Sequence, residues 1–228
     1  MTDAPELVSK KVETSTLTQE HPEDEKTQDI CKQYAFIRRI KGDGNCFYRA
    51  LIFGHLESLL QNVRDMQNFK DKLMQTSKDL LTAGFNESSF KDILNTFVSV
   101  VERCEADDQG TTLLELFNEQ HASNSTVQYL RLLTSAYLQN HSDFFQHFVE
   151  APSLKEYCTQ EVEAMAMECD HVEITALSEA LGISIHIVSM EEGDGRLTHH
   201  TIPEGANPSL HLLYKTSHYD ILYPNIHL

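Results

Sequence analysis

The sequence KGDGNCFYRA, residues 41–50, decides how the rest of the chain is interpreted. Gly42 and Gly44 permit a tight backbone loop, and the apolar residues that follow recur at helical spacing, so a helix is predicted to begin at Cys46. Unpaired N–H groups and the positive end of the helix dipole favour the thiolate form of a cysteine at such a position. The same N–H groups can donate to the oxyanion that forms when a carbonyl is attacked. The position therefore indicates a nucleophilic cysteine.

The alternative for this stretch is a buried cysteine at a helix start, beside a glycine loop of the kind that binds phosphate. The glycines alone do not discriminate, because a second Gly-Asp-Gly at 193–195 lies in a predicted hairpin turn and has no cysteine after it. The placement of Cys46 in the first helical turn is the feature that favours a nucleophile.

A thiolate enzyme needs a base, and among twelve histidines His218 stands out in the sequence Thr-Ser-His-Tyr-Asp. Residues two apart in a strand point to the same side, so Asp220 is expected to lie beside the His218 ring and to fix its tautomer. This is the orienting arrangement of a Cys–His–acid triad. The alternative is a histidine at a hairpin edge with a carboxylate that favours solubility. His171, His199 and His200 have no comparable partner in the sequence.

Hydrophobic periodicity predicts helices first and strands last. After the helix that begins at Cys46, helices are expected at 66–81, 90–104, 127–137 and 174–181. Strands are expected at 183–187, 197–202, 210–215 and 218–223. We predict that these strands pair in an antiparallel sheet. Because no Pro- or Gly-rich linker divides this region, the pattern indicates one α+β domain, mostly helical with a C-terminal antiparallel sheet.

The chain has 228 residues and a formal net charge of −17, from 18 Lys and Arg against 35 Asp and Glu. Nucleic-acid recognition depends on Lys and Arg clusters, so this charge argues against nucleic acid and equally against an anionic membrane surface. A basic protein surface is the partner that it favours. The sequence has no apolar run near the roughly 18 residues of a membrane span, and no signal peptide is recognised. We expect a cytoplasmic protein, with the nucleus as a second location.

Five scattered cysteines agree with a reducing compartment, because a secreted disulfide scaffold of this length would be denser and even-numbered. The sequence has no Cys-x-x-Cys pair, which excludes a zinc ribbon. The loosest metal candidate combines Cys158, Cys169 and His171 near Asp170. It lacks a close-spaced pair, and structural zinc sites need four ligands. Ordinary core or surface cysteines are the favoured interpretation, and no metal is expected.

Residues 1–33 are predicted to form a flexible acidic arm ahead of the folded domain at 34–228. Acidic side chains dominate this segment, and no apolar periodicity lasts for more than one turn. A short helix is expected only from Glu23 to Cys31. The favoured interpretation of the arm is a solvated tail.

Taken together, the motifs resemble the ovarian-tumour (OTU) family of deubiquitinating cysteine proteases, and the otubain subfamily closely. The sequence GDGNCFYRA at 42–50 is similar to the otubain nucleophile motif, and HYDILY at 218–223 is similar to its C-terminal histidine motif. Shorter matching stretches lie between them, at 132–136, 168–171 and 212–215. The resemblance covers residues 34–224 in the family's order, whereas the arm matches poorly and looks shorter than in the long-armed otubains.

The resemblance implies an OTU-type papain-like cysteine protease fold, with 34–228 as the catalytic domain. It implies that Cys46 is the nucleophile, His218 the general base and then acid, and Asp220 the acid that orients the histidine. Asp43 matches a family position in the oxyanion loop, where we interpret it as a loop organiser, since a carboxylate cannot stabilise an oxyanion directly. The predicted oxyanion donors are the backbone N–H groups of Gly44, Asn45 and Cys46.

The implied reaction is hydrolysis of an isopeptide bond after the C-terminal Gly-Gly of ubiquitin, through a thioester and without a metal or organic cofactor. Ubiquitin and lysine-linked polyubiquitin chains are the implied partners, with ubiquitin-conjugating enzymes as further ones.

Two alternatives compete with this reading. The first is a binding protein that docks ubiquitin-charged conjugating enzymes and blocks them without catalysis, an activity that uses the arm in this family. The second is a papain-like peptidase, which would be expected to show a Cys-Gly-Ser-Cys run that is missing here. The intact set of Cys46, His218 and Asp220 favours the hydrolase.

Overall fold

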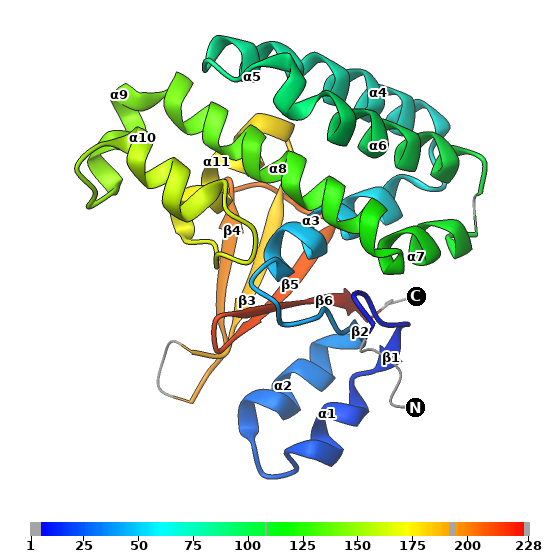
Figure 1. Cartoon of the computed structure of the whole chain (residues 1–228). Helices are drawn as coiled ribbons and strands as arrows, with labels where there is room; N and C mark the ends of the chain where they lie inside the picture. Colours follow the sequence, from blue (N-terminus) through cyan, green and yellow to red (C-terminus); the bar gives the residue numbers. More distant parts are fainter. Residues whose placement is uncertain (1–5, 108, 192–194, 226–228) are drawn as a thin grey trace, which may run out of the picture.

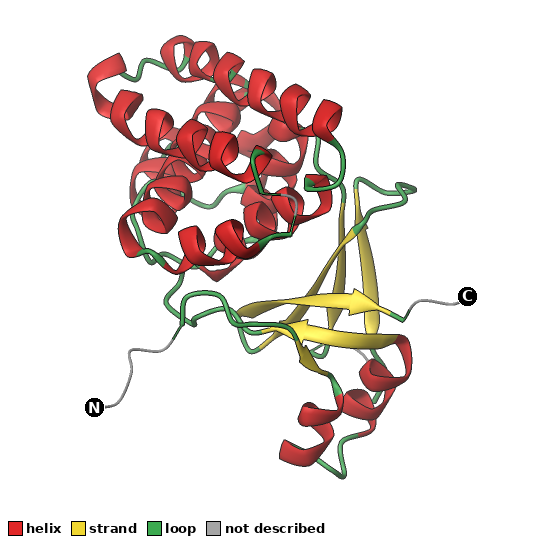
Figure 2. Cartoon of the chain, turned by 90° about the vertical axis from the view of Figure 1, so that its right-hand side faces the viewer, coloured by secondary structure: helices red, strands yellow, loops and turns green. Residues whose placement is uncertain are grey.

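The computed structural model describes residues 6–107, 109–191 and 195–225. A six-stranded sheet lies between a large group of helices on one side and two short helices on the other (Figure 1, Figure 2). The helices are α1 (Ser15–Glu20), α2 (Glu25–Gln33), α3 (Cys46–Leu59), α4 (Val63–Gln75), α5 (Ser77–Thr82), α6 (Glu87–Glu105), α7 (Thr111–Asn118), α8 (Gln120–Asn140), α9 (Ser142–Phe145), α10 (Leu154–Tyr157) and α11 (His171–Leu181), with a 3-10 turn η1 (Gln146–Phe148) and a π-helical turn η2 (Cys158–Val162). The strands are β1 (Val12–Glu13), β2 (Tyr34–Arg38), β3 (Ile185–Ser189), β4 (Thr198–Ile202), β5 (Leu210–Lys215) and β6 (His218–Pro224). The predicted turn at 193–195 lies outside the described residues except for Gly195.

The strands pair in the order β1-β2-β6-β5-β3-β4. Most neighbours are antiparallel, but β3 and β5 run parallel, with Ile185 opposite Leu210. The prediction of an antiparallel sheet is therefore wrong for this pair, and the sheet is mixed. The reason is that β4 returns along one side of β3, so the chain crosses to the other side before β5 begins and runs there in the direction of β3. The sheet also extends beyond the C-terminal strands, because β1 and β2 join it at the free side of β6.

Alternation along the strands divides the apolar side chains between two cores. Leu212 and Ile221 belong to the main core, which also contains the buried face of α3. Their neighbours Leu213 and Leu222 point to the other side and belong to a second core with α1 and α2. The sheet thus has an apolar layer on both faces.

The predicted flexible arm is wrong for residues 6–33, which fold as β1, α1 and α2 and pack on the second core. Leu17 of α1 and Ile30 of α2 are buried there beside Tyr34. Each of the two short helices buries very few side chains, so the sequence shows no sustained apolar face although the segment is packed. The helix expected from 23 to 31 is confirmed as α2.

Two of the predicted helices have different bounds in the structure. The helix expected at 66–81 is divided at Thr76 into α4 and α5, and the buried Thr76 hydroxyl hydrogen-bonds the Tyr129 hydroxyl at 2.6 Å. The helix expected at 127–137 begins earlier, at Gln120, and forms the long α8. The buried side chains in the first half of α8 are mostly polar, so apolar periodicity does not indicate a helix there.

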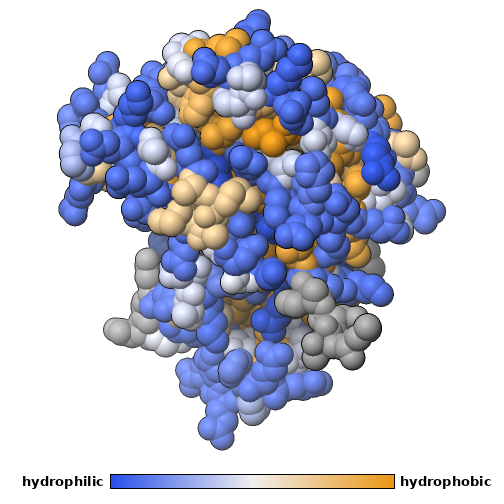
Figure 3. Space-filling model, viewed as in Figure 1, coloured by the Kyte–Doolittle hydropathy of each residue, from blue (hydrophilic) through white to orange (hydrophobic). Residues whose placement is uncertain are grey.

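The face of the molecule shown in Figure 3 is mainly hydrophilic, with apolar residues visible in smaller groups between the helices. Within the described ranges, every helix is too short or too polar to cross a bilayer.

Candidate active site

Cys46 is the first residue of α3, as predicted, and its side chain is buried at a narrow pocket. The loop before it is tightly constrained at Gly44, which has a φ of +82°. A Cβ atom on Gly44 would lie 2.0 Å from the carbonyl oxygen of Ala166. Only glycine fits both the backbone conformation and this close approach, so the cysteine loop and the segment around residue 166 are in direct contact.

Asp43 organises the turn that leads into α3. One carboxylate oxygen, Oδ1, accepts the backbone N–H of Asn45 at 3.0 Å. The other, Oδ2, lies 3.2 Å from Nη2 of Arg49, a fully buried arginine one turn into α3. Because the N–H of Asn45 is bonded to Asp43, the prediction that Asn45 donates to an oxyanion is wrong. The backbone N–H groups of Gly44 and Cys46 are left as the candidate donors.

The Asn45 side chain faces α8. Its Oδ1 accepts hydrogen bonds from Nη2 of Arg131 at 2.7 Å and from the backbone N–H of Ala166 at 2.9 Å. Sequence reasoning missed Arg131 and Ala166. The signal available for Arg131 was a single arginine inside an apolar run, directly before the 132–136 match, which is typical of a buried and hydrogen-bonded charge.

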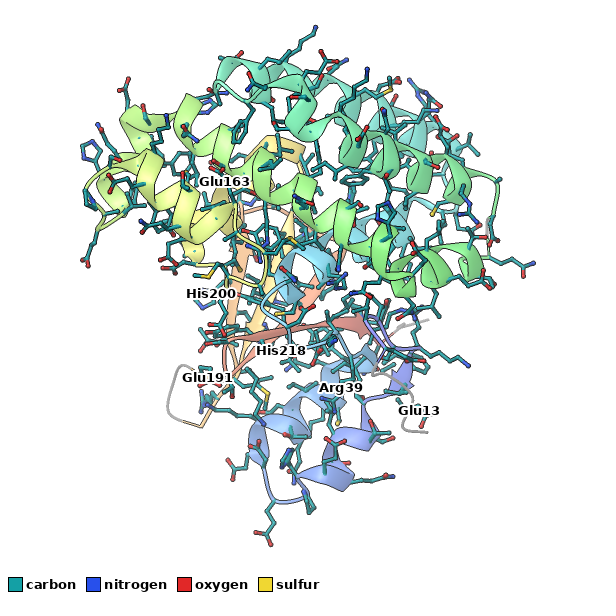
Figure 4. The ribbon with its side chains drawn as sticks, viewed as in Figure 1. Glu13, Arg39, Glu163, Glu191, His200 and His218 are labelled. Atoms are coloured by element: carbon teal, nitrogen blue, oxygen red, sulfur yellow. The ribbon has the colours of Figure 1, made fainter. Side chains whose placement is uncertain are left out.

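His218 lies at the start of β6 and is oriented by Asp220. The His218 Nε2 atom is 2.9 Å from Oδ1 of Asp220, so the ring presents Nδ1 on its other edge, toward Gly42. Asp220 is 5% exposed, and the same Oδ1 accepts the backbone N–H of Ile40 at 2.7 Å. Nη1 of Arg39 lies 3.9 Å from Oδ2 of the same carboxylate. Figure 4 labels both Arg39 and His218. The structure therefore brings the predicted histidine and acid together and adds two partners from the residues after β2.

The electrostatics of this arrangement favour a protonated histidine. Hydrogen bonding to Asp220, and then to Cys46, raises the pKa of His218 to about 10, although burial acts in the opposite direction. An imidazolium beside a sulfur atom stabilises the thiolate, which is the nucleophilic form of cysteine. Both Asp220 and Cys46 therefore act on the charge of the His218 ring.

A strained turn holds His218 in this position. Thr216 and Ser217 join β5 to β6 with φ values of +54° and +58°, and Lys215 pairs with His218 across the two-residue loop. Two consecutive residues of positive φ are typical of a type I′ hairpin, which fixes the register of both strands. Neither residue is glycine, and such left-handed conformations often occur at functional sites.

The pocket at Cys46 has a volume of about 30 Å³. Its walls are Gly44, Cys46, Phe47, Glu168, Cys169, Tyr214, Ser217 and Tyr219. A second hollow of about 240 Å³ shares Cys169, Tyr214 and Tyr219 with it and continues past His171 and Ile202. The shared walls place the two hollows side by side, and together they are called the channel, which extends from the cysteine toward β4.

The fold separates the two cysteines of the metal candidate. Cys158 is buried in an apolar cluster with Leu138 and Phe145, whereas Cys169 lines the channel. Within the described ranges, no three His, Cys, Asp or Glu side chains are grouped to hold a metal ion. Burial, Glu173 and Cys46 raise the pKa of Cys169 well above its usual range, so this second thiol in the channel stays protonated.

The chain is similar to proteins named as ubiquitin thioesterases. It is 51% identical over 222 residues to mouse "Ubiquitin thioesterase OTUB2", with 95% of each chain covered. It is 46% identical over 224 residues to rat "Ubiquitin thioesterase OTUB1", covering 95% of this chain and 83% of that protein. The fold matches a structure titled "The structure of a ceOTUB1 ubiquitin aldehyde UBC13~Ub complex", with a TM-score of 0.91, 27% identity, and 98% of this chain and 96% of the other covered.

The family model described as Peptidase C65 Otubain matches residues 1–224, which include the arm as well as the predicted catalytic domain. Both the motifs and the fold agree with that match. The chain therefore belongs to the Peptidase C65 otubain family.

Proposed function

We propose that this chain is a ubiquitin thioesterase that hydrolyses the isopeptide bond after the C-terminal Gly-Gly of ubiquitin. The observation that carries the proposal is the hydrogen-bonded pair of His218 and Asp220, which lies beside Cys46 at a narrow channel. The names of the relatives support the same substrate.

Acyl transfer begins with the thiolate of Cys46, which attacks the carbonyl carbon of the last glycine of ubiquitin. The N–H groups of Gly44 and Cys46 are placed to donate to the oxyanion. The C–N bond to the lysine then breaks, and His218 gives its proton to the departing amine. The products of this half are a free lysine side chain and a thioester on Cys46.

In hydrolysis of the thioester, His218 acts as a base instead of an acid. The neutral ring takes a proton from water, which attacks the same carbonyl, and the oxyanion again faces the Gly44 and Cys46 donors. The C–S bond breaks, ubiquitin leaves as a C-terminal carboxylic acid that loses its proton to solvent, and the thiolate–imidazolium pair is restored. Asp220 keeps the ring in one orientation through both halves.

The channel supports a Gly-Gly specificity. The hollow next to Cys46 is small, about 30 Å³, which favours residues without side chains at this point of the substrate. Phe47, Tyr214 and Tyr219 are the aromatic residues of its walls. The wider hollow beyond would take the next residues of an extended tail, and the exposed carboxylates of Glu168 and Asp170 suit a basic one. We expect lysine-linked polyubiquitin chains as substrates.

A second candidate function is the binding of ubiquitin-conjugating enzymes. It is favoured by the solved structures with TM-scores of 0.90 and 0.91, whose titles name UBCH5B~Ub and UBC13~Ub complexes. In this chain the arm is packed on the sheet, so it offers a folded surface to such a partner. An inhibitor acting in this way would still block conjugation after Cys46→Ser.

Turnover of diubiquitin by the purified chain tests the proposal. The wild-type protein is expected to release ubiquitin, and Cys46→Ser is expected to abolish release because serine has no thiolate. Cys31→Ser is the matched control, since Cys31 lies in α2 and its sulfur contacts the carbonyl of Thr14. No turnover by the wild type, or full turnover by Cys46→Ser, would refute the hydrolase.

A further inference from the structure

Arg131 lies in the middle of α8 with its side chain fully buried. A buried charge is destabilising unless hydrogen bonds satisfy it. In the part of the chain that the structure describes, none of the ion pairs involves Arg131. Its guanidinium stacks on the ring of Tyr48, 4.4 Å from the centroid, and is otherwise held by oxygen acceptors on two loops.

The first of these loops is the cysteine loop. Nη2 of Arg131 donates to the backbone carbonyl of Gly44 at 3.1 Å and to Oδ1 of Asn45 at 2.7 Å. The peptide between Gly44 and Asn45 is also held at its other end, because its N–H donates to Asp43 at 3.0 Å. A cation and an anion thus fix the same peptide plane from opposite sides.

The second loop begins at the last residue of η2 and lies against Gly44. Nη1 of Arg131 donates to the carbonyl of Val162 at 3.1 Å, and Nη2 donates to that of Met167 at 2.8 Å. The backbone N–H of Ala166 completes the connection by donating to Oδ1 of Asn45. Arg131 therefore fastens two loops, far apart in sequence, on either side of the cysteine pocket.

Fixing the 44–45 peptide also restricts the N–H groups before and after it, since neighbouring peptide planes share a Cα atom and differ only by rotation about its two bonds. Those N–H groups belong to Gly44 and Cys46, the candidate oxyanion donors. We propose that Arg131 is a positioning residue that holds these donors in the direction required for acyl transfer. The proposal rests on the proposed function, because it assigns a task within that reaction.

A lysine at position 131 would keep the positive charge but lose the planar shape of the guanidinium. The planar guanidinium reaches acceptors on two loops at once, whereas an ammonium is a compact charge on a flexible stem and cannot hold the same fork. Arg131→Lys should therefore loosen the loops while leaving Cys46, His218 and Asp220 in place. A shift of about 1 Å in catalytic geometry lowers rates by about 100-fold.

The test separates reactions that need an oxyanion hole from one that does not. Diubiquitin turnover passes through an oxyanion, but alkylation of Cys46 by iodoacetamide is a displacement at carbon and needs only the thiolate. For Arg131→Lys we expect kcat to fall by about 10- to 100-fold, with KM and the alkylation rate within about threefold of wild type. All rates are measured well below the melting temperature of each variant.

Arg38→Lys is the matched control, because Arg38 is also a largely buried arginine and bonds Tyr223 and Glu57, which are not in the channel. It should leave all three quantities near wild type. If Arg131→Lys does not fold, Asn45→Ala takes its place under the same criteria, since it removes the side-chain acceptor from the same guanidinium.

An unchanged kcat, or an alkylation rate that falls in step with kcat, would overturn the positioning role. Loss of kcat with alkylation preserved supports it. Absence of turnover by the wild-type chain would instead refute the proposed function, so the two failures are distinguishable.

Discussion

Gly44 combines a left-handed backbone with a neighbour at 2.0 Å from its missing Cβ, and Gly84 provides a natural comparison. Gly84 also has a positive φ, +98°, but nothing lies within 4 Å of a Cβ there. Gly84→Ala should lower the free energy of unfolding by about 1–2 kcal/mol, the usual penalty of this backbone region, with activity retained.

Gly44→Ala should be more destabilising than that and should also lower kcat by at least about 100-fold, because the loop around Ala166 must move. Urea unfolding and diubiquitin kinetics on both variants measure the difference. Equal effects of the two substitutions would show that the contact with Ala166 has no role.

Asp220 is expected to set the alkaline limit of activity. Hydrogen bonding to Asp220 and Cys46 raises the pKa of His218 to about 10, so the imidazolium is lost, and kcat/KM falls, as pH rises through that value. Asp220→Asn keeps an acceptor for the N–H of Ile40 but removes the negative charge, so this limb should move to lower pH by about one unit or more. The measurement is kcat/KM against pH for both proteins.

The raised pKa of His218 also makes the stability of the fold depend on pH. Because the folded pKa of His218 lies above its ordinary value of 6.5, the ring stabilises the fold fully below 6.5 and loses that contribution as pH rises through about 10.

For the activity profile, an alkaline limb of kcat/KM that stays at the same pH in Asp220→Asn would mean that another group controls the proton on the histidine.

At this scale the sequence was informative for the catalytic residues, whose signals are close along the chain. Cys46 follows its loop directly, and His218 and Asp220 are two residues apart in one strand. It was uninformative for Arg131, whose acceptors lie on segments distant in the sequence. The N–H of Asn45 was misassigned because its bond to Asp43 depends on a local turn that periodicity does not report.

At the level of elements, the β5–β6 hairpin positions the histidine through a turn of unfavourable residues. Thr216 is β-branched and has a φ of +54°, whereas asparagine is among the residues preferred at this position of a type I′ turn. Thr216→Asn should therefore raise the free energy of unfolding by about 0.5–1 kcal/mol. The backbone N–H of residue 216 would keep its bond to Glu191. A measured loss of stability by urea unfolding would contradict the assignment of strain.

The sequence does not predict which strands pair or in which direction they run. Alternation identified the strands, because each has a buried and an opposite face. It carries no information on direction, so the parallel pairing of β3 and β5 depends on the crossover between β4 and β5. β1 is only Val12–Glu13, too short to show any periodicity.

At the level of the whole molecule, residues 6–33 are part of the packed fold. Ile30 is fully buried against the sheet, so Ile30→Ala should lower the free energy of unfolding by about 2–4 kcal/mol. Leu81, which is 50% exposed in α5, is the control, and Leu81→Ala should change it by less than about 0.5 kcal/mol. Urea unfolding gives both values. If Ile30→Ala is as stable as the wild type, residues 6–33 are only loosely attached to the fold.

The central claim is that Cys46 is the nucleophile of a ubiquitin-directed hydrolase. The most direct measurement is labelling by a ubiquitin C-terminal electrophile, followed by peptide mapping of the modified residue among the five cysteines. We predict one ubiquitin adduct, on Cys46, with labelling strongly slowed in His218→Ala. An adduct on Cys169 or any other cysteine, or labelling of Cys46→Ser at the wild-type rate, would contradict the assignment.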